Sequence, residues 1–500
     1  MAWMRRALVR DQRRGNYDRE TLAKVGDAQP HREGAGSRRR RPGDGSGRRV
    51  VSGLFFFPRG GSAQVARALA RALPQAGWEV TQAAGSLGGP GEQTHAPSFF
   101  PDLDLVAVDY SPETGGVPFQ PSYEDRPGAP DRVFASIGDD EYERLVEVWV
   151  GALERAGARR AELLHLHHLT PANEAARRAF PTLPVVGQLH GTELAMLRTL
   201  EADAPAGWRF AERWRLRLRG WAGECARLIV PPAAGDDVAR LLAVPHRAIV
   251  ELPSGVELDL FRRQPLERDR RLAHWRRWLV EQPLGWDESG VPGSVAYTDA
   301  DLWPLREAEA IVLYIGRYTA VKRLPLLIRA HAQALARLER PLPLVLVGGS
   351  PGEWEGEHPL TAARAAGDEQ VFLTGWRPHQ QLPQALNAAD LLVLPSVAEA
   401  FGLVLVEAMA CGLPVLAADA HGPAQIVAPG TGWLVPADDQ HALTEALLSA
   451  ASDPRERRQR GERAHRHARS GYGWPMIAAR IADIYNQVSG GVDAQRAARA

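Results

Sequence analysis

The sequence is poor in cysteine and has no long hydrophobic run. Only Cys225 and Cys411 occur among 500 residues, too few for a disulfide framework and consistent with a reducing compartment. No stretch of about 18 apolar residues is present, so no membrane-spanning helix is predicted. The opening residues MAWMRRALVR lack the apolar segment of a secretory signal. These absences predict a soluble, cytoplasmic protein.

Lysine is nearly absent as well. Among 60 basic residues only Lys24 and Lys322 are lysines, and arginine fills every other basic position. A coding bias toward arginine is the simplest cause, but an ammonium and a planar guanidinium are not interchangeable at a crowded phosphate. The two exceptions are therefore informative. The 60 acidic residues bring the formal net charge to zero, which argues against a nucleic-acid partner.

The chain is long enough for two domains with appendages, and its 45% of apolar residues supplies their cores. Residues 1–48, which include SRRRRPGDGSGRR, show no sustained apolar period and are predicted to form a disordered basic tail. A solvated tail is the simplest interpretation of its charge run. Contact with nucleic acid or an anionic surface is the alternative, and a misassigned start codon would also explain it.

From residue 49 onward, apolar strands alternate with amphipathic helices, which is the pattern of parallel α/β units. Residues 49–257 and 310–470 each contain such a series, so we expect two Rossmann-like doubly wound domains facing a central cleft that binds a ligand. The predicted strands of the first lie in VVSGLFFF, DLDLVAVDY, AELLHLHHL, PVVGQLH, RLIVPP and AIVELP, and those of the second in IVLYIGR, LPLVLVGG, QVFLTGW, DLLVLPS, PVLAADA and GWLVP.

The segment between the two domains, residues 258–309, is rich in tryptophan. Its indoles belong to Trp275, Trp278, Trp286 and Trp303. A small satellite core is the simplest interpretation, and a sugar-stacking or lid role is the alternative, because indole faces suit carbohydrate rings. Residues 471–490 are predicted to form a C-terminal helix, followed by a tail over residues 491–500.

Two carboxylates stand out in PSVAEAFGLVLVEAMACGLPV. Glu399 is expected in the loop after a strand, and Glu407 about two turns into the following helix. Both would then lie near the carboxyl ends of the parallel strands, the edge where open α/β sheets bind ligands. Burial of an unsatisfied carboxylate is costly, and a vicinal diol offers two donors to one carboxylate. A merely solvated acid is the alternative.

This stretch resembles the signature of the retaining glycosyltransferases of family 4, which have the two-domain GT-B fold. The resemblance extends from about Val51 to Val488. It implies that Glu407 holds the ribose hydroxyls of a nucleotide-sugar and that Glu399 lies at the donor sugar. It also implies that the backbone amides around Phe401, Gly402 and Leu403 approach the donor, which suits a glycine-containing loop entering a helix.

The stretch YIGRYTAVKRLPLL places Arg317 and Lys322 between a strand and the next helix. This pair resembles the family's Arg and Lys that neutralise the leaving diphosphate. The rarity of lysine gives the assignment of Lys322 independent weight. An ordinary surface arginine is the alternative for Arg317 taken alone.

In the first domain, Gly60 and Gly61 match the Gly-rich loop that in relatives faces the diphosphate and acceptor, although such a glycine turn is often purely structural. The stretch QLHGTELAM contains His190 and Glu193. The resemblance implies that His190 reaches the donor sugar or the acceptor, whereas a lone histidine is more often structural.

The run HLHH, with His165, His167 and His168, suggests metal ligands at first sight. It lacks acids at usable spacing, and the GT-B architecture does not generally need a metal, so we expect none.

The resemblance also places the nucleobase near Gly348, Gly349, Gly375 and Trp376, where tight turns are an equally good explanation. The stretches PSGVELDLF and SGYGWPMIAARIADIY resemble the end of the family's first domain and the final helix that crosses back onto it. Relatives commonly have Gly-Gly-x-x-Glu where this chain has His421, Gly422, Pro423, Ala424 and Gln425, so the contact of that glutamate does not transfer. Ala400 replaces a frequent glycine.

The sequence thus predicts a retaining glycosyltransferase that moves a sugar from a nucleoside-diphosphate donor to a hydroxyl acceptor, without cofactor or metal. A lipid acceptor would bring it to a membrane surface. A phosphorylase or sugar-phosphate synthase on the same fold is the first alternative. A non-catalytic nucleotide or glycan binder is the second, because Gln425 departs from the family pattern.

Overall fold

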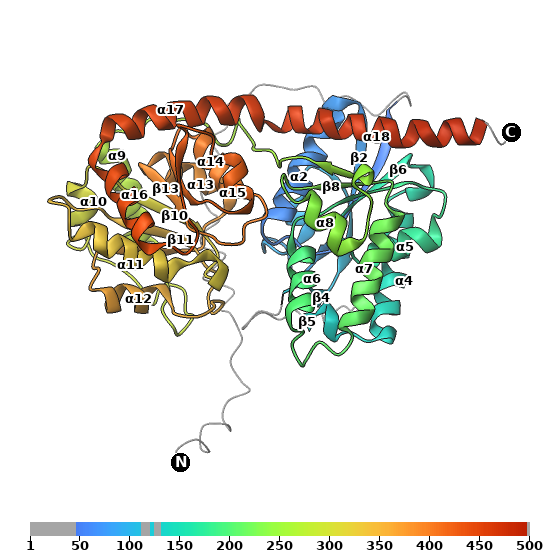
Figure 1. Cartoon of the computed structure of the whole chain (residues 1–500), viewed down its shortest axis with the longest axis horizontal. Helices are drawn as coiled ribbons and strands as arrows, with labels where there is room; N and C mark the ends of the chain where they lie inside the picture. The colour runs from blue at the N-terminus through green and yellow to red at the C-terminus, as the bar shows by residue number, and fades with distance from the viewer. Residues whose placement is uncertain (1–46, 112–120, 125–131, 498–500) are drawn as a thin grey trace, which may run out of the picture.

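The computed structural model of the chain describes residues 47–111, 121–124 and 132–497, with side chains as far as Gly490. Two α/β domains lie side by side, and the last two helices run along one side of both (Figure 1). The predicted α/β class with two doubly wound domains is confirmed. The predicted basic tail, residues 1–48, lies outside the described residues except for Gly47 and Arg48.

The first domain is built on a seven-stranded parallel sheet in the order β3-β2-β1-β6-β7-β8-β9. All six strands predicted here are present. The strands are β1 (Arg48–Leu54), β2 (Trp78–Ser86), β3 (Asp104–Asp109), β6 (Leu163–His167), β7 (Val185–Gln188), β8 (Arg227–Val230) and β9 (Ile249–Glu251). The α-helices are α2 (Gly61–Ala72), α3 (Ala96–Phe99), α4 (Asp139–Arg155), α5 (Pro171–Ala179), α6 (Thr192–Ala202), α7 (Ala211–Glu224) and α8 (Gly235–Leu242). A two-stranded sheet pairs β4 (Pro121–Ser122) with β5 (Arg132–Val133).

Strand β2 was not predicted. Its sequence, WEVTQAAGS, has neither a β-branched apolar run nor a regular alternation of apolar and polar residues. The strand is instead buried through small residues such as Ala83 and Ala84, which give little strand signal in a sequence.

The second domain has a six-stranded parallel sheet in the order β12-β11-β10-β13-β14-β15. Its strands, all predicted, are β10 (Val312–Gly316), β11 (Leu344–Gly348), β12 (Val371–Gly375), β13 (Leu391–Leu394), β14 (Val415–Ala418) and β15 (Gly432–Val435). Its α-helices are α11 (Leu324–Leu335), α12 (Pro359–Ala366), α13 (Leu382–Asn387), α14 (Leu403–Ala410), α15 (His421–Ile426), α16 (Gln440–Ser452) and α17 (Pro454–Gly471).

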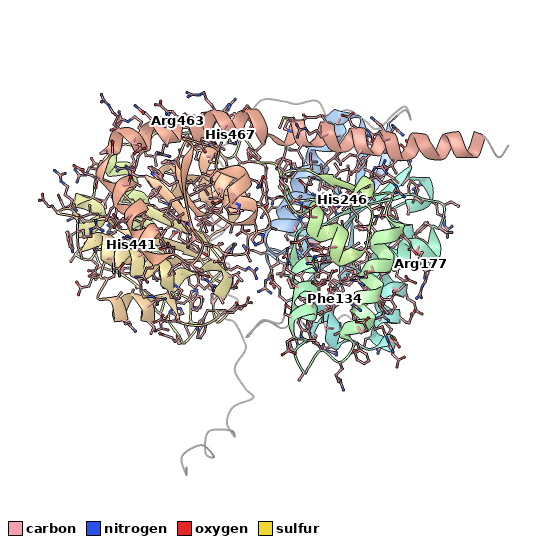
Figure 2. All side chains as sticks on the ribbon, in the orientation of Figure 1. Phe134, Arg177, His246, His441, Arg463 and His467 are labelled. Atoms are coloured by element: carbon pink, nitrogen blue, oxygen red, sulfur yellow. The ribbon has the colours of Figure 1, made fainter. Side chains whose placement is uncertain are left out.

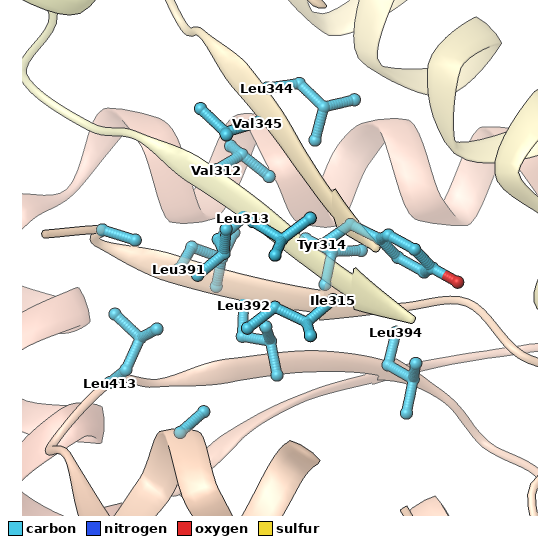
Figure 3. Packing of buried hydrophobic residues seen from close by; sticks show 14 of the residues in the cluster. Val312, Leu313, Tyr314, Ile315, Leu344, Val345, Leu391, Leu392, Leu394 and Leu413 are labelled. Atoms are coloured by element: carbon cyan, nitrogen blue, oxygen red, sulfur yellow. The ribbon is translucent and has the colours of Figure 1, made fainter. Parts of the chain in front are cut away.

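The core of this domain explains why its strands are continuous apolar runs. Residues of the central strands, including Leu313, Val345 and Leu392, are fully buried among one another (Figure 3). Helices cover both faces of a doubly wound parallel sheet, so each strand buries both of its faces. Helix α17, which carries Arg463 (Figure 2), is tied to the same domain. The guanidinium of Arg463 donates a hydrogen bond to the carbonyl oxygen of Gly430 at 2.6 Å.

The tryptophan-rich segment belongs to the second domain. It contains α9 (Arg268–Arg276), a π-helical turn (Arg277–Glu281) and α10 (Trp303–Glu307). Trp275, Trp278 and Trp286 are fully buried in the main core of that domain rather than in a separate satellite core. Trp303 is 51% exposed.

The final helix, α18 (Trp474–Ala497), packs on the first domain. Trp474 and Tyr485 are buried in a cluster with Val50 and Trp78, so the chain returns to the domain in which it began. The helix runs beyond its predicted end at residue 490, because the VDAQRA stretch after Gly491 includes good helix formers. No helix among the described residues combines the length and apolarity needed to cross a bilayer.

Candidate active site

The carboxyl ends of β10 and β13 bring Lys322 and Glu399 together. The ammonium of Lys322 donates a hydrogen bond to the carboxylate of Glu399, and the two side chains are 14% and 20% exposed. The amide of Val397 donates to the carbonyl oxygen of Val321 at 3.0 Å, which joins the two loops. The lone lysine of the second domain and the first of the two signature acids therefore form one charged pair at the sheet edge.

Glu407 lies in α14, and its partner is a histidine from another loop. The helix begins at Leu403, so Glu407 is a little more than one turn into it, not two. The Nε2 atom of His379, in the turn after β12, is 2.7 Å from Oε1 of Glu407. The two side chains are only 15% and 9% exposed. Sequence reasoning missed His379, whose one signal is its place shortly after a predicted strand.

The loop between the two acids is held by glycines and by a neighbouring loop. Gly402 has φ 97°, in the left-handed region that glycine adopts without strain, and it precedes the first turn of α14. Phe401 is buried, and a Cβ on Gly422 would collide with its backbone. The amide of Gly422 donates to the carbonyl oxygen of Glu399 at 3.0 Å. The altered loop at residues 421–425 thus still supports residues 395–402, the signature loop between β13 and α14, while Gln425 is exposed.

Arg317 pairs with a residue of the other domain. Its guanidinium donates to both carboxylate oxygens of Glu124, at 2.9 and 3.4 Å. Burial lowers the pKa of Arg317, but the charge and hydrogen bonds of Glu124 outweigh it, so the pKa is raised and the guanidinium stays charged. Arg317 and Lys322 therefore lie on the same loop with separate acidic partners. Glu124 was not singled out in the sequence.

Other close approaches join the two domains. A Cβ on Gly61 would lie 3.2 Å from Cδ1 of Leu403, and one on Gly191 would lie 2.6 Å from Cβ of Ala400. Gly60, at φ 76°, precedes α2 and has open space at its Cβ position. The first domain's glycine loops therefore lie against the signature loop. Here Ala400 fills the space beside Gly191.

Arg59 of the first domain also forms an ion pair across the cleft, with Glu353 of the second. Beside the cleft, a small pocket is lined from both domains, by residues that include Gln64, Glu257, Phe261, His379, Leu403 and Glu407.

His190 lies at the end of a chain of histidines. Its Nε2 atom shares a hydrogen bond of 3.1 Å with Nδ1 of His167, whose ring stacks on His165. His165 is hydrogen-bonded to the hydroxyl of Tyr485 in α18. Burial lowers the pKa of His190 well below its usual range, and the neighbouring histidines lower it further. A neutral His190 has one donor and one acceptor nitrogen.

The remaining predicted residues of this region have structural partners. Glu193 is fully buried, and its carboxylate is 2.7 Å from Nδ1 of His168. Within the described part of the chain, no group of three or more His, Cys, Asp or Glu side chains is placed to hold a metal ion.

The glycines predicted near the nucleobase are closely packed by protein. A Cβ on Gly348 would collide with the carbonyl oxygen of Gly316, and one on Gly375 with that of Leu284. The Cβ direction of Gly349 is filled by Tyr318 and Trp286, whose rings stack. The tryptophan-rich segment thus covers the ends of β11 and β12. Trp376 follows β12 and is partly exposed, so it remains a candidate for contact with a base.

Comparison with known proteins identifies the class. Residues 59–260 match the family model "Glycosyltransferase Family 4", and residues 299–467 match "Glycosyl transferases group 1". D-inositol 3-phosphate glycosyltransferase 1 of Catenulispora acidiphila is 31% identical over 373 residues, 69% of this chain and 79% of that protein. The D-inositol 3-phosphate glycosyltransferase of Nocardia farcinica is 32% identical over 290 residues, 56% of this chain and 63% of that protein. That of Kribbella flavida is 36% identical over 181 residues, 35% of this chain and 42% of that protein. The matches to the latter two span less than two thirds of their length.

Solved structures share the fold. Sucrose-phosphate synthase from Thermosynechococcus elongatus superposes with a TM-score of 0.62 at 20% identity, covering 89% of this chain and 100% of that one. The Anabaena protein HepE, solved with UDP and glucose, gives a TM-score of 0.61 at 17% identity, covering 88% and 100%. The structural neighbours are glycosyltransferases of the GT-B fold, which confirms the predicted architecture.

Proposed function

Because the chain belongs to the family 4 glycosyltransferases, also described as glycosyl transferases group 1, we propose that it transfers a sugar from a nucleoside-diphosphate-sugar to a hydroxyl acceptor with retention of configuration. The observation that carries the proposal is the assembly of Lys322, Glu399 and Glu407 at one sheet edge, against glycine loops of the facing domain. An anionic diphosphate and a polyhydroxylated sugar need these groups, namely fixed cations and buried carboxylates.

In the proposed complex, Arg317 and Lys322 bind the diphosphate, Glu407 accepts hydrogen bonds from the ribose, and Glu399 orients the donor sugar. The amides around Phe401, Gly402 and Leu403 and the loop of Gly60 and Gly61 approach the diphosphate and sugar. The base lies along the strand ends near Trp376. Without ligand, Arg317 pairs with Glu124 and Lys322 pairs with Glu399. The diphosphate therefore competes with the carboxylate of Glu124 for Arg317.

Transfer in this proposal needs no protein nucleophile. The bond from the anomeric carbon to the β-phosphate oxygen breaks, the acceptor oxygen bonds to the same face of that carbon, and the acceptor proton passes to the departing phosphate oxygen. Arg317 and Lys322 stabilise the charge that develops there. A neutral His190 orients a reacting hydroxyl. Domain closure excludes water and limits donor hydrolysis. The two cations supply the positive charge that a divalent metal supplies elsewhere, so we propose activity without added metal.

The acceptor class is suggested by the relatives. Their names specify D-inositol 3-phosphate, and sucrose-phosphate synthase shares the fold, so a phosphorylated polyol or sugar is the first acceptor class to test. Transfer to inorganic phosphate would instead identify a phosphorylase.

The test begins with UDP-, GDP- and ADP-sugars. A true donor should raise the melting temperature further as its concentration rises above its dissociation constant, and Glu407→Ala should abolish that shift. Candidate acceptors, D-inositol 3-phosphate first, are then added in the presence of EDTA, and the anomeric configuration of the product is read by NMR. If no nucleotide-sugar binds the folded wild type, the transferase proposal is wrong. A product with inverted anomeric configuration would contradict the proposed retention but not the proposed sugar transfer.

A further inference from the structure

We propose that His379 is a positioning residue that fixes the carboxylate of Glu407 for the two ribose hydroxyls of the donor nucleotide. This inference rests on the proposed function, because it assigns a partner within the proposed donor site. Its basis is the 2.7 Å contact between Nε2 of His379 and Oε1 of Glu407, made between two largely buried side chains.

The carboxylate needs such a partner because α14 offers it none. Its neighbours on the helix are apolar residues, including Val406, Ala408 and Ala410, all fully buried. An ionised carboxylate in such surroundings is costly unless hydrogen bonds satisfy it. The Nε2–H of His379 satisfies Oε1. Among the described residues no hydrogen bond is made to Oε2, which leaves that oxygen and the second lone pair of Oε1 for a diol.

The histidine is itself held in place. Its ring packs edge-on against Phe261 at a centroid distance of 5.0 Å. Its second nitrogen, Nδ1, is buried and has no hydrogen-bond partner within the described part of the chain. Among the described residues, the hydrogen bond to Glu407 is thus the one polar contact that orients this ring. The pairing of His379 with Glu407 therefore has a structural purpose, although His379 lies outside the sequence signature. Both residues also line the small pocket beside the cleft.

A histidine that served only to stabilise α14 would act differently. His465 provides the comparison, since its Nδ1 donates to the carbonyl oxygen of Ala410 at the end of the same helix, at 2.7 Å. It approaches α14 from α17, and no hydrogen bond or ion pair among the described residues joins it to Glu407. Loss of His465 therefore removes a hydrogen bond to α14 while leaving the carboxylate and its partner intact.

The experiment measures dissociation constants by calorimetry for UDP and 2′,3′-dideoxy-UDP, or for the guanosine or adenosine pair if wild type prefers that base. Hydrogen bonds from ribose hydroxyls to a held carboxylate should make the ribonucleotide bind about 10- to 100-fold tighter than its dideoxy analogue in wild type. In His379→Leu the ratio should fall to about 3 or less, with the dideoxy analogue bound nearly as in wild type. In His465→Leu the ratio should remain that of wild type.

Two further variants keep the test decisive if His379→Leu does not fold. In His379→Gln the side-chain amide replaces the Nε2 donor and should preserve most of the ratio, whereas the shorter His379→Asn should lose it. In turnover, His379→Asn should raise KM for the donor by about 10-fold with kcat changed less.

An unchanged ratio in His379→Leu or His379→Asn overturns the inference while the proposed function stands. Equal losses in the His379 and His465 variants also overturn it, since they would show that both act only through the helix. If neither nucleotide binds wild type, the proposed function fails and the inference fails with it.

Discussion

In the second domain, Lys322 pairs with Glu399 and Glu407 with His379, all within one sheet edge. The first domain reaches the cleft differently, through Gly61 and Gly191, which contact the signature loop, and through Glu124, which pairs with Arg317. One domain therefore holds its charged groups ready before any ligand arrives. The first domain adds its glycine loops and Glu124 to the site only where it packs against the second, so these contributions depend on the relative position of the two domains.

The histidines that lead to His190 differ from the site histidine of the second domain. In the first domain, His165, His167 and His190 form a chain from the cleft to α18, and burial lowers the pKa of each. The site histidine of the second domain pairs with a carboxylate instead, as His168 of the first domain does with Glu193. Neutral histidines orient hydroxyls and pack against the crossing helix, whereas a histidine beside a carboxylate fixes an anion.

The largest expected effect is on donor turnover, and it distinguishes a site cation of the second domain from a neighbouring surface cation. Lys322→Arg should lower donor turnover by about 10²- to 10³-fold, because a guanidinium cannot replace a compact ammonium between Glu399 and the diphosphate. The matched control is Arg323→Lys at the adjacent position, whose side chain pairs with Asp438 at the surface and should stay within about twofold of wild type. Equal turnover in both variants would contradict the role of Lys322.

The next prediction concerns packing at the strand ends of the second domain. Gly375→Ala should lower the free energy of unfolding by about 2–4 kcal/mol, because φ is 68° and the added Cβ meets the carbonyl oxygen of Leu284. Gly367, at φ 65°, has open space at its Cβ position, so Gly367→Ala should cost only about 1 kcal/mol. Urea unfolding followed by tryptophan fluorescence measures both, and equal losses would mean that the tryptophan-rich segment does not press on β12.

The third prediction tests the neutral histidines of the first domain. Burial lowers the pKa of His165 to about 4, so the unfolded chain binds a proton at higher pH than the folded one. The contribution of neutral His165 to the free energy of unfolding is fully present above about pH 6.5 and is lost as the pH falls toward 4. At pH 5 the loss amounts to about 2 kcal/mol.

Melting temperatures at pH 7.5 and pH 5 should therefore differ less in His165→Gln than in wild type. The exposed His441 of α16 supplies the control (Figure 2), and His441→Gln should keep the wild-type difference. If the two variants behave alike, His165 does not contribute to the pH dependence.

The smallest effect concerns the ion pair that joins the domains. Glu124→Gln should tighten nucleoside-diphosphate binding by about 2- to 5-fold, because the diphosphate no longer competes with a carboxylate for Arg317 and because a partly exposed pair is worth about 1 kcal/mol or less. Glu357→Gln, which removes the surface partner of Arg329, should leave affinity unchanged. Calorimetry at two salt concentrations checks both, and weaker binding in Glu124→Gln would show that this carboxylate supports the site instead.

The sequence by itself determined the two doubly wound domains. Of the thirteen strands in their two large sheets, all but β2 were predicted in order, because buried parallel strands must be apolar runs and their spacing survives in one dimension. It also determined the loop positions of Glu399, Arg317 and Lys322, since these follow predicted strands. The tertiary structure alone decided their partners. His379 and Glu407 are separated by 28 positions, and Glu124 and Arg317 by 193, so no local pattern links them. Trp275, Trp278 and Trp286 likewise joined the main core because the tryptophan-rich segment folds across β11 and β12. A hydrogen bond or packing contact depends on distance in space, which a sequence records only where one motif contains both partners.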